Sequence, residues 1–148
     1  METRTLEPAA ALLGRLLLSA IFLHEAVAKF TGYATALAYM ETFGVPGAAL
    51  PLAVAVELGG GIAILAGFQT RTSALMLAGF CVATAFLFHT RLGIRNELLH
   101  FEKDLAIAGG FLVLAAFGAG AWSVDAWMRR RSLDRRPHLA ESGTTRAW

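Results

Sequence analysis

The sequence is poor in charged residues and has almost no cysteine. Asp, Glu, Lys and Arg make up 16% of its 148 residues, whereas a soluble domain carries about 25%. Cys81 stands alone, so no intramolecular disulfide can form, and no CxxC motif is present for redox exchange or zinc. No segment alternates like a β-strand, and no spacing is typical of a zinc or iron–sulfur site. These absences argue against a soluble domain, a disulfide-stabilised protein and a metal centre.

Long apolar runs are what the sequence has instead. Hydrophobic residues make up 56% of the chain, and a membrane-spanning helix needs about 20 mostly apolar residues. Four stretches meet this requirement, at about residues 8–30, 47–68, 72–89 and 99–121. Their even number and short joints predict an all-α membrane protein, with an antiparallel bundle of four transmembrane helices occupying residues 1–125.

Arginines gather after the fourth stretch and predict the orientation. They are Arg129, Arg130, Arg131, Arg135, Arg136 and Arg146. The positive-inside rule places such a segment in the cytoplasm. Four spans then bring the N-terminus to the same side and leave residues 31–46 and 90–98 outside. We expect residues 126–148 to be a basic, disordered cytoplasmic tail, and its charge concerns topology rather than a nucleic-acid partner.

The first stretch has one alternative interpretation. Ala26-Val27-Ala28 matches the small-x-small site at which signal peptides are cleaved. However, Arg15, His24 and Glu25 interrupt the apolar run that a signal peptide requires. We therefore expect this stretch to remain as a spanning helix.

Ionisable residues within or beside the apolar stretches form the candidate site. A charged group at the centre of a membrane helix costs about 2.5–3.5 kcal/mol on insertion scales, so Glu57 needs a partner. Glu25 and Lys29 are four residues apart and can pair on one helix face. Depth along each helix, at about 1.5 Å per residue, brings these polar residues to the outer half of the bundle: Glu57, His24, Glu25, Lys29, His89, His100 and Asp104.

Two interpretations of this outer cluster stay open. In the first, it lines a pocket for a quinone or another small redox-active molecule, because carboxylates and histidines suit hydrogen bonding and proton transfer near neutral pH. In the second, Glu57 is neutral and hydrogen-bonded, and its role is structural. A haem held by His24 and His89 fits poorly, because one histidine lies within the bilayer and the other at its edge.

A second polar group is predicted near the cytoplasmic face. Arg15 lies about two turns into the first helix, Arg71 lies in the joint between the second and third, and Asp125 follows the fourth. We expect Asp125 to form a structural ion pair with Arg71 or Arg15 there, where long side chains reach the headgroups. The second helix also carries a four-residue repeat that favours close helix packing, within the bundle or between copies, at Ala55, Gly59, Ala63 and Gly67.

Taken together, these motifs resemble the DoxX family over about residues 10–125. The resemblance rests on Arg15-Leu16-Leu17-Leu18, Phe22-Leu23-His24, Lys29-Phe30, Gly32-Tyr33, Phe43-Gly44-Val45-Pro46-Gly47, Glu57-Leu58-Gly59-Gly60-Gly61, Gly67-Phe68-Gln69-Thr70-Arg71-Thr72, Phe88-His89, Lys103-Asp104-Leu105, Gly109-Gly110-Phe111, Gly118-Ala119-Gly120 and Ser123-x-Asp125.

The resemblance implies a four-helix protein of the bacterial inner membrane. The family is named after a subunit tied to a terminal quinol oxidase and to thiosulfate:quinone oxidoreductase, and other members are linked with resistance to quinones and to thiol-reactive or oxidative stress. Glu25 departs from the small residue expected after the histidine. The family's recurrent polar positions correspond to His24, Lys29, Glu57, Arg71, His89 and Asp125.

Three functions follow as hypotheses. The first is a quinone-associated redox component, which as an enzyme would be a subunit of a quinone-linked oxidoreductase. The second is a non-catalytic scaffold that docks a soluble or membrane oxidoreductase through the basic tail and the inner joint. The third is a small proton-coupled exporter using Glu57, which would need a homo-oligomer because four spans are few for a transporter.

Overall fold

Seven helical segments make up the part of the chain, residues 3–134, that the computed structural model describes. They are α1 (Thr3–Thr31), α2 (Tyr33–Thr42), the 3-10 turn η1 (Gly47–Ala49), α3 (Leu50–Ala66), α4 (Thr70–Phe88), α5 (Arg95–Phe117) and α6 (Val124–Asp134). No strand occurs within these residues. The all-α prediction is therefore confirmed.

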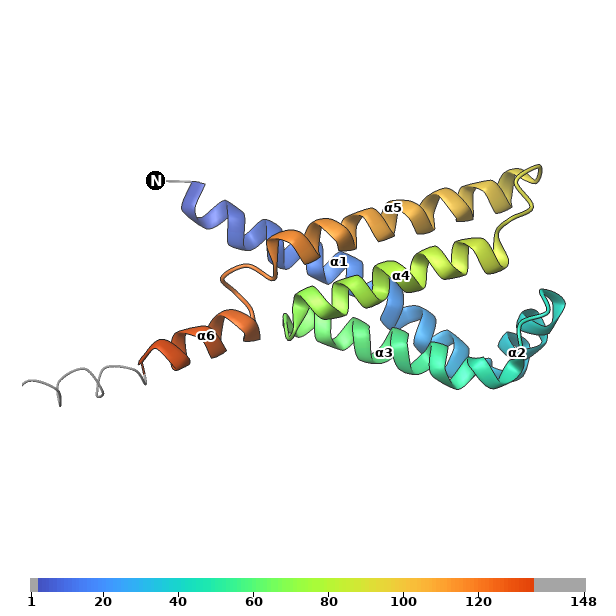
Figure 1. The fold of residues 1–148 in the computed structure, drawn as a ribbon, viewed down its shortest axis with the longest axis horizontal. Helices are drawn as coiled ribbons and strands as arrows, with labels where there is room; N and C mark the ends of the chain where they lie inside the picture. The colour runs from blue at the N-terminus through green and yellow to red at the C-terminus, as the bar shows by residue number, and fades with distance from the viewer. Residues whose placement is uncertain (1–2, 135–148) are drawn as a thin grey trace, which may run out of the picture.

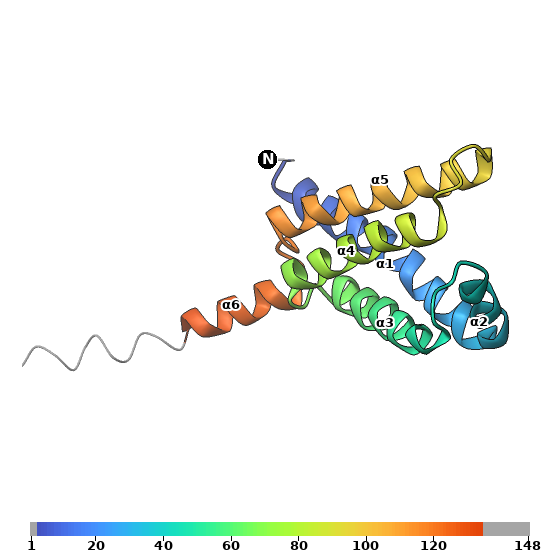
Figure 2. The same cartoon turned by 45° about the vertical axis from the view of Figure 1, so that its right-hand side comes forward.

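The long helices run antiparallel to one another in two pairs (Figure 1). α1 packs mainly against α3 and α4 mainly against α5, while contacts between α3 and α4 join the pairs and α1 scarcely touches α5. The start of α1, the α3–α4 joint and α6 lie at one end of the bundle. α2 and the α4–α5 loop lie at the other end, as the rotated view also shows (Figure 2). We call these the α6 end and the α2 end.

Two neighbouring glycines let α3 sit between α1 and α4. A Cβ atom on Gly60 would lie 2.8 Å from Leu77 Cδ2 of α4, and one on Gly61 would lie 3.0 Å from Leu23 Cδ2 of α1. The predicted repeat of small residues meets its neighbours only at one end, because Ala55 and Gly59 are exposed whereas Gly67 is buried against Arg15 of α1. Ala55 and Gly59 lie on a different face of α3 from Gly60 and Gly61, which contact α4 and α1.

The core of the bundle combines a few aromatic rings with aliphatic and small side chains. Phe22 of α1 contacts Phe111 of α5 edge to face, with ring centroids 5.3 Å apart, and Phe80 of α4 at 6.4 Å. Buried Ile64 of α3 and Leu77 of α4 also belong to it, together with the small residues Ala74, Ala78, Cys81, Ala108 and Ala115. Aromatic pairs of this geometry add about 0.5–1.5 kcal/mol beyond their buried area, so Phe22 connects both helix pairs.

Two short helices and two shifted boundaries correct the sequence prediction. Residues 31–46 contain the helix α2, and residues 126–134 of the predicted tail belong to α6. Residues 135–148 lie outside the described part of the chain. α5 begins four residues earlier than predicted, because its polar first turns hold good helix formers, and it ends at Gly118 with φ +83°. α1 begins before Pro8, which lies inside the helix.

Three of the described segments are long and apolar enough to cross a membrane: Leu6–Thr31, Gly47–Ala66 and Thr70–Phe88. α5 has 23 residues, but charged residues fill its first turns, and its uninterrupted apolar part is 105–117. Large apolar side chains are exposed along the bundle, including Leu17 (66%), Phe86 (60%) and Val113 (59%). An apolar surface of this kind is suited to contact with lipid.

Candidate functional site

A cavity of about 1000 Å³ opens at the α2 end of the bundle. Residues of α1, α2, α3, α4 and α5 line it, and most of its wall is apolar or aromatic. Cavities that bind small molecules have volumes of about 300–1000 Å³ and combine an apolar wall with a few polar groups. Six of the seven predicted outer-cluster residues line this cavity: Glu25, Lys29, Glu57, His89, His100 and Asp104.

The α1–α3 wall carries a chain of three charged side chains. Lys29 Nζ lies 2.9 Å from Glu25 Oε2 and 2.9 Å from Glu57 Oε1. The predicted Glu25–Lys29 pair is therefore present, and Lys29 is also the partner that Glu57 requires. Glu57 is only 4% exposed, and its second oxygen, Oε2, has no hydrogen-bond partner among the described residues.

Local helix geometry explains this arrangement. Glu25 and Lys29 are one turn apart on α1, and Gly32, which follows the end of α1 and precedes α2, also lines the cavity. Because a Cβ is absent at Gly61, α1 packs closely on α3 and the lysine side chain reaches the carboxylate of the neighbouring helix.

The α4–α5 wall carries a second polar group. His89 Nδ1 lies 3.0 Å from Glu97 Oε2, and the His89 ring stacks on that of His100 with centroids 5.0 Å apart. Thr84 Oγ1 donates a hydrogen bond of 3.3 Å to Asp104. Sequence reasoning missed Glu97 as a site residue. Its short separation from His89 could have indicated this contact, because the two residues are eight positions apart across a tight loop that brings the two helix ends together.

Helix α2 contributes an aromatic side to the same cavity. Tyr39 stacks on Phe88 with ring centroids 5.7 Å apart, and Phe43 packs on both of them. Burial raises the pKa of the Tyr39 hydroxyl, the charge of Glu97 raises it further, and Arg91 opposes both. Tyr39 is therefore a neutral hydrogen-bond donor at physiological pH.

His24 does not join this cluster. It is exposed on α1 and does not line the cavity. Successive residues of a helix point about 100° apart, so a helix that turns Glu25 and Lys29 toward α3 directs His24 elsewhere. His24 and His89 therefore do not face a common space, which removes the geometry on which the haem alternative depended.

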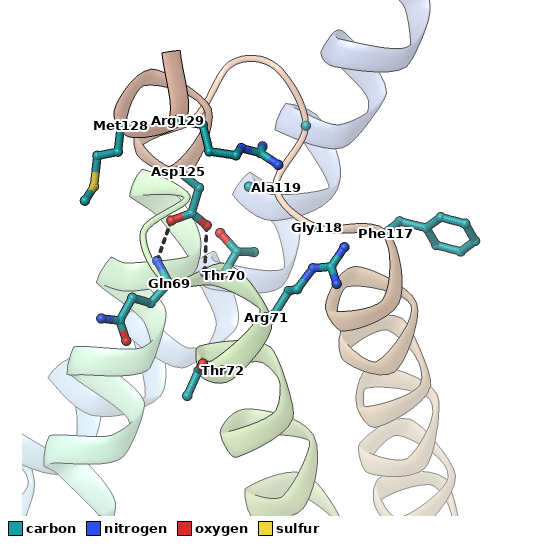
Figure 3. A pocket seen from close by; sticks show the side chains of 11 residues that line it. Gln69, Thr70, Arg71, Thr72, Phe117, Gly118, Ala119, Asp125, Met128 and Arg129 are labelled. Atoms are coloured by element: carbon teal, nitrogen blue, oxygen red, sulfur yellow. Dashed lines mark hydrogen bonds between the residues drawn. The ribbon is translucent and has the colours of Figure 1, made fainter. Parts of the chain in front are cut away.

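The α6 end holds the second predicted group in a different arrangement. Asp125 accepts hydrogen bonds from the backbone N–H groups of Gln69 (2.8 Å) and Thr70 (2.9 Å), as Figure 3 shows. Its own N–H donates to Gly67 O at 2.9 Å. Within residues 3–134 no arginine lies within 4 Å of its carboxylate, so the predicted ion pair is replaced by capping of α4 from a distant segment.

The pKa of Asp125 reflects this capping. Burial alone would raise it, but the hydrogen bonds from Thr70 and Gln69 and the charge of Arg129 together hold the pKa of the carboxyl below its usual range. The positive end of the α4 dipole acts in the same direction. The carboxylate is thus charged at neutral pH.

Arg15 is buried beside this joint, with 1% of its surface exposed. Its Nη2 donates to the backbone carbonyl of Trp122. A Cβ on Gly67 would overlap Arg15 Nη1 and lie 2.5 Å from Ser123 Cβ, and Gly67 has φ +69°. Arg15 therefore occupies the space that glycine leaves at the end of α3, where the helix dipole favours a cation.

The fold and the two polar ends define a small helical membrane protein, and the relatives of the chain agree. The DoxX family profile matches residues 10–90. Inner membrane protein YqjF of Escherichia coli (strain K12) is 47% identical over 128 residues, covering 86% of this chain and 98% of that protein. Inner membrane protein YphA of the same organism is 32% identical over 125 residues, covering 80% and 89%. No solved structure matches significantly.

The chain belongs to the DoxX family and is an inner-membrane protein. The resemblance seen in the sequence motifs and the predicted membrane location are both confirmed.

Proposed function

We propose that this DoxX-family protein binds a quinone-type molecule in the cavity at the α2 end and acts as a quinone-associated membrane component. The ion pair between the buried Glu57 and the half-buried Lys29 on the cavity wall carries the proposal. A charged pair in a membrane helix bundle is costly, and ionisable residues within membrane spans typically mark ligand or proton pathways.

The lining supplies the groups that a quinone needs. Its carbonyl oxygens accept hydrogen bonds, and Lys29 Nζ and the ring nitrogens of His89 and His100 are donors on opposite walls. A quinol hydroxyl needs an acceptor, and Glu57 Oε2 is a buried acceptor without a partner among residues 3–134. Aromatic side chains of the cavity suit a flat ring.

The test is binding of a short-chain ubiquinone to the full-length protein in lipid nanodiscs, measured by titration calorimetry. We expect Glu57→Gln to weaken binding about tenfold, because hydrogen bonds to charged groups contribute about 1.5–3 kcal/mol. Glu102→Gln is the matched control, because Glu102 is exposed on α5 and does not line the cavity.

Equal affinity of Glu57→Gln and the unmodified protein would remove the main residue of this proposal. A scaffold role would then be tested by deleting residues 129–148 and measuring capture of the partner oxidoreductase. If Glu57→Gln instead abolishes efflux of a quinone or organic acid while binding persists, the exporter hypothesis is favoured.

We also propose that α5 crosses the membrane, giving four spans with both termini in the cytoplasm. α5 lies beside α4 over the bundle's length (Figure 1), and 23 residues extend about 34 Å. The arginines of α6 support a cytoplasmic location for that end.

Single cysteines in a Cys81→Ala background test this topology. We expect Thr42→Cys and Gly93→Cys to react with an impermeant maleimide from the periplasm, and Leu133→Cys to react only after the inner membrane is opened. Labelling of positions 93 and 133 from the same side would show that α5 does not cross.

A further inference from the structure

A second hollow, of about 470 Å³, lies at the α6 end. The first turn of α4, the segment between α5 and α6, and α6 itself line it. Its lining includes Gly118 and Gly120, which have positive φ of 83° and 78°. The ordinary capping role of Asp125 fixes the hollow's shape but does not account for the basic residues around it.

Two arginines extend into this hollow from different helices. Arg71 comes from α4 and Arg129 from α6, and both side chains reach toward the Gly118–Ala119 segment (Figure 3). Within the described residues 3–134, neither has a carboxylate within 4 Å. The carboxylate of Asp125 accepts two backbone hydrogen bonds. The two guanidinium groups therefore leave an excess of positive charge in the hollow.

The guanidinium groups are the donors that this hollow offers. Thr70 also lines it, but its side chain is 0% exposed and acts on the neighbouring Asp125 carboxylate, whose pKa it lowers. Two guanidinium groups beside a glycine-containing segment are a donor set for an oxyanion, because planar guanidinium groups bind phosphate through paired N–H bonds.

We propose that this hollow binds the phosphate group of an anionic phospholipid through Arg71 and Arg129. Its rim is apolar on two sides, where Phe117 is 83% exposed and Met128 is 48% exposed, and these side chains suit acyl chains. Arg71 is also the second residue of the candidate span Thr70–Phe88, which puts the hollow at the level of lipid headgroups. Basic pockets at the ends of membrane helices bind acidic lipids in this way.

The test is native mass spectrometry of the full-length protein titrated with phosphatidylglycerol, phosphatidylcholine or inorganic phosphate. We expect phosphatidylglycerol to bind in preference to phosphatidylcholine. Arg71→Gln and Arg129→Gln should each weaken that binding about fivefold, which corresponds to about 1 kcal/mol per basic residue near an acidic lipid surface. Arg71→Lys should retain part of the affinity, because lysine keeps the charge without the planar fork.

Arg130→Gln is the matched control, because Arg130 is exposed on α6, next to Arg129, and does not line the hollow. Equal losses in Arg129→Gln and Arg130→Gln would overturn the proposal in favour of general attraction to acidic membranes. Displacement of phosphatidylglycerol by millimolar inorganic phosphate would assign the site to a soluble anion. Far-ultraviolet circular dichroism of each variant separates lost binding from lost folding.

Discussion

Lys29 of α1 and Glu57 of α3 join two membrane-embedded helices through an ion pair of 2.9 Å, and Lys29 at the same time holds Glu25. Removing one member of a buried pair leaves an uncompensated charge, whereas removing both does not. Comparing the single and double variants therefore separates the effect of the pair on stability from its effect on the cavity.

We predict that Lys29→Met destabilises the protein by about 3 kcal/mol, and that adding Glu57→Leu restores most of the loss. Cys81 offers the measurement, because it is 3% exposed and the chain has no other cysteine. A thiol-reactive dye thus reports unfolding on heating. Glu25→Gln is the control, since the Glu25 side chain is 51% exposed and such pairs contribute about 0–1 kcal/mol. A double variant as unstable as the single one would contradict this account.

A glycine pair provides a second prediction. Gly67→Ala should destabilise the protein by more than about 1 kcal/mol, because alanine is strained at φ +69° and its Cβ would meet Arg15 and Ser123. Gly59→Ala, the same change inside the helix that Gly67 ends, should be neutral or stabilising by up to about 1 kcal/mol, because nothing lies within 4 Å of its Cβ position. Thermal unfolding of both variants compares them, and equal effects would refute the role given to Arg15.

The distant cap of α4 gives a third prediction. Asp125→Ala leaves the N–H groups of Gln69 and Thr70 without their acceptor and should cost about 1–2 kcal/mol. Asp125→Asn, which keeps one side-chain carbonyl oxygen, should cost less. Hydrogen exchange of the Gln69 and Thr70 amides measures the cap directly, and unchanged protection in Asp125→Ala would disprove it.

The same carboxylate makes stability depend on pH. Its pKa is lowered in the folded protein, and an unfolded aspartate has a pKa near about 3.9. The stabilisation is therefore fully present above that value and is lost as the pH falls through the lower folded pKa. The stability difference between the unmodified protein and Asp125→Asn should shrink below about pH 4, measured by chemical unfolding at each pH. A difference that is constant from pH 6 to pH 2 would be inconsistent with this linkage.

The long helices and their antiparallel order were predictable from the sequence, because apolar runs of about 20 residues are a strong signal. α2 and α6 were not, since helices of 10 and 11 residues are too short for that signal. The triple arginine of α6 is equally typical of a disordered tail. Within the described residues, the predictable helices were thus the long ones, whose length is set by the thickness of the bilayer.

The sequence predicted how deep each candidate site residue lies in the bundle, but not which way its side chain points. Counting residues from the ends of each helix brought Glu57 and Lys29 to one level, and the structure joins them. His24 lies at the same level, but it is one residue from Glu25 and points elsewhere. Asp125 was assigned to an arginine because opposite charges attract, whereas the free N–H groups at the start of α4 were the closer partner. Where a side chain points and which partner it meets depend on helix rotation and tertiary packing, and residue spacing does not determine either.

The cap of α4 also orders events during synthesis. Thr70 and Asp125 are 55 residues apart, so a growing chain makes the α3–α4 joint long before its acceptor leaves the ribosome. Domains and their parts generally assemble from the N-terminus during translation. We therefore expect the joint to lack its acceptor while α4 and α5 are being made, and the synthesis of α6 to complete the cap of α4.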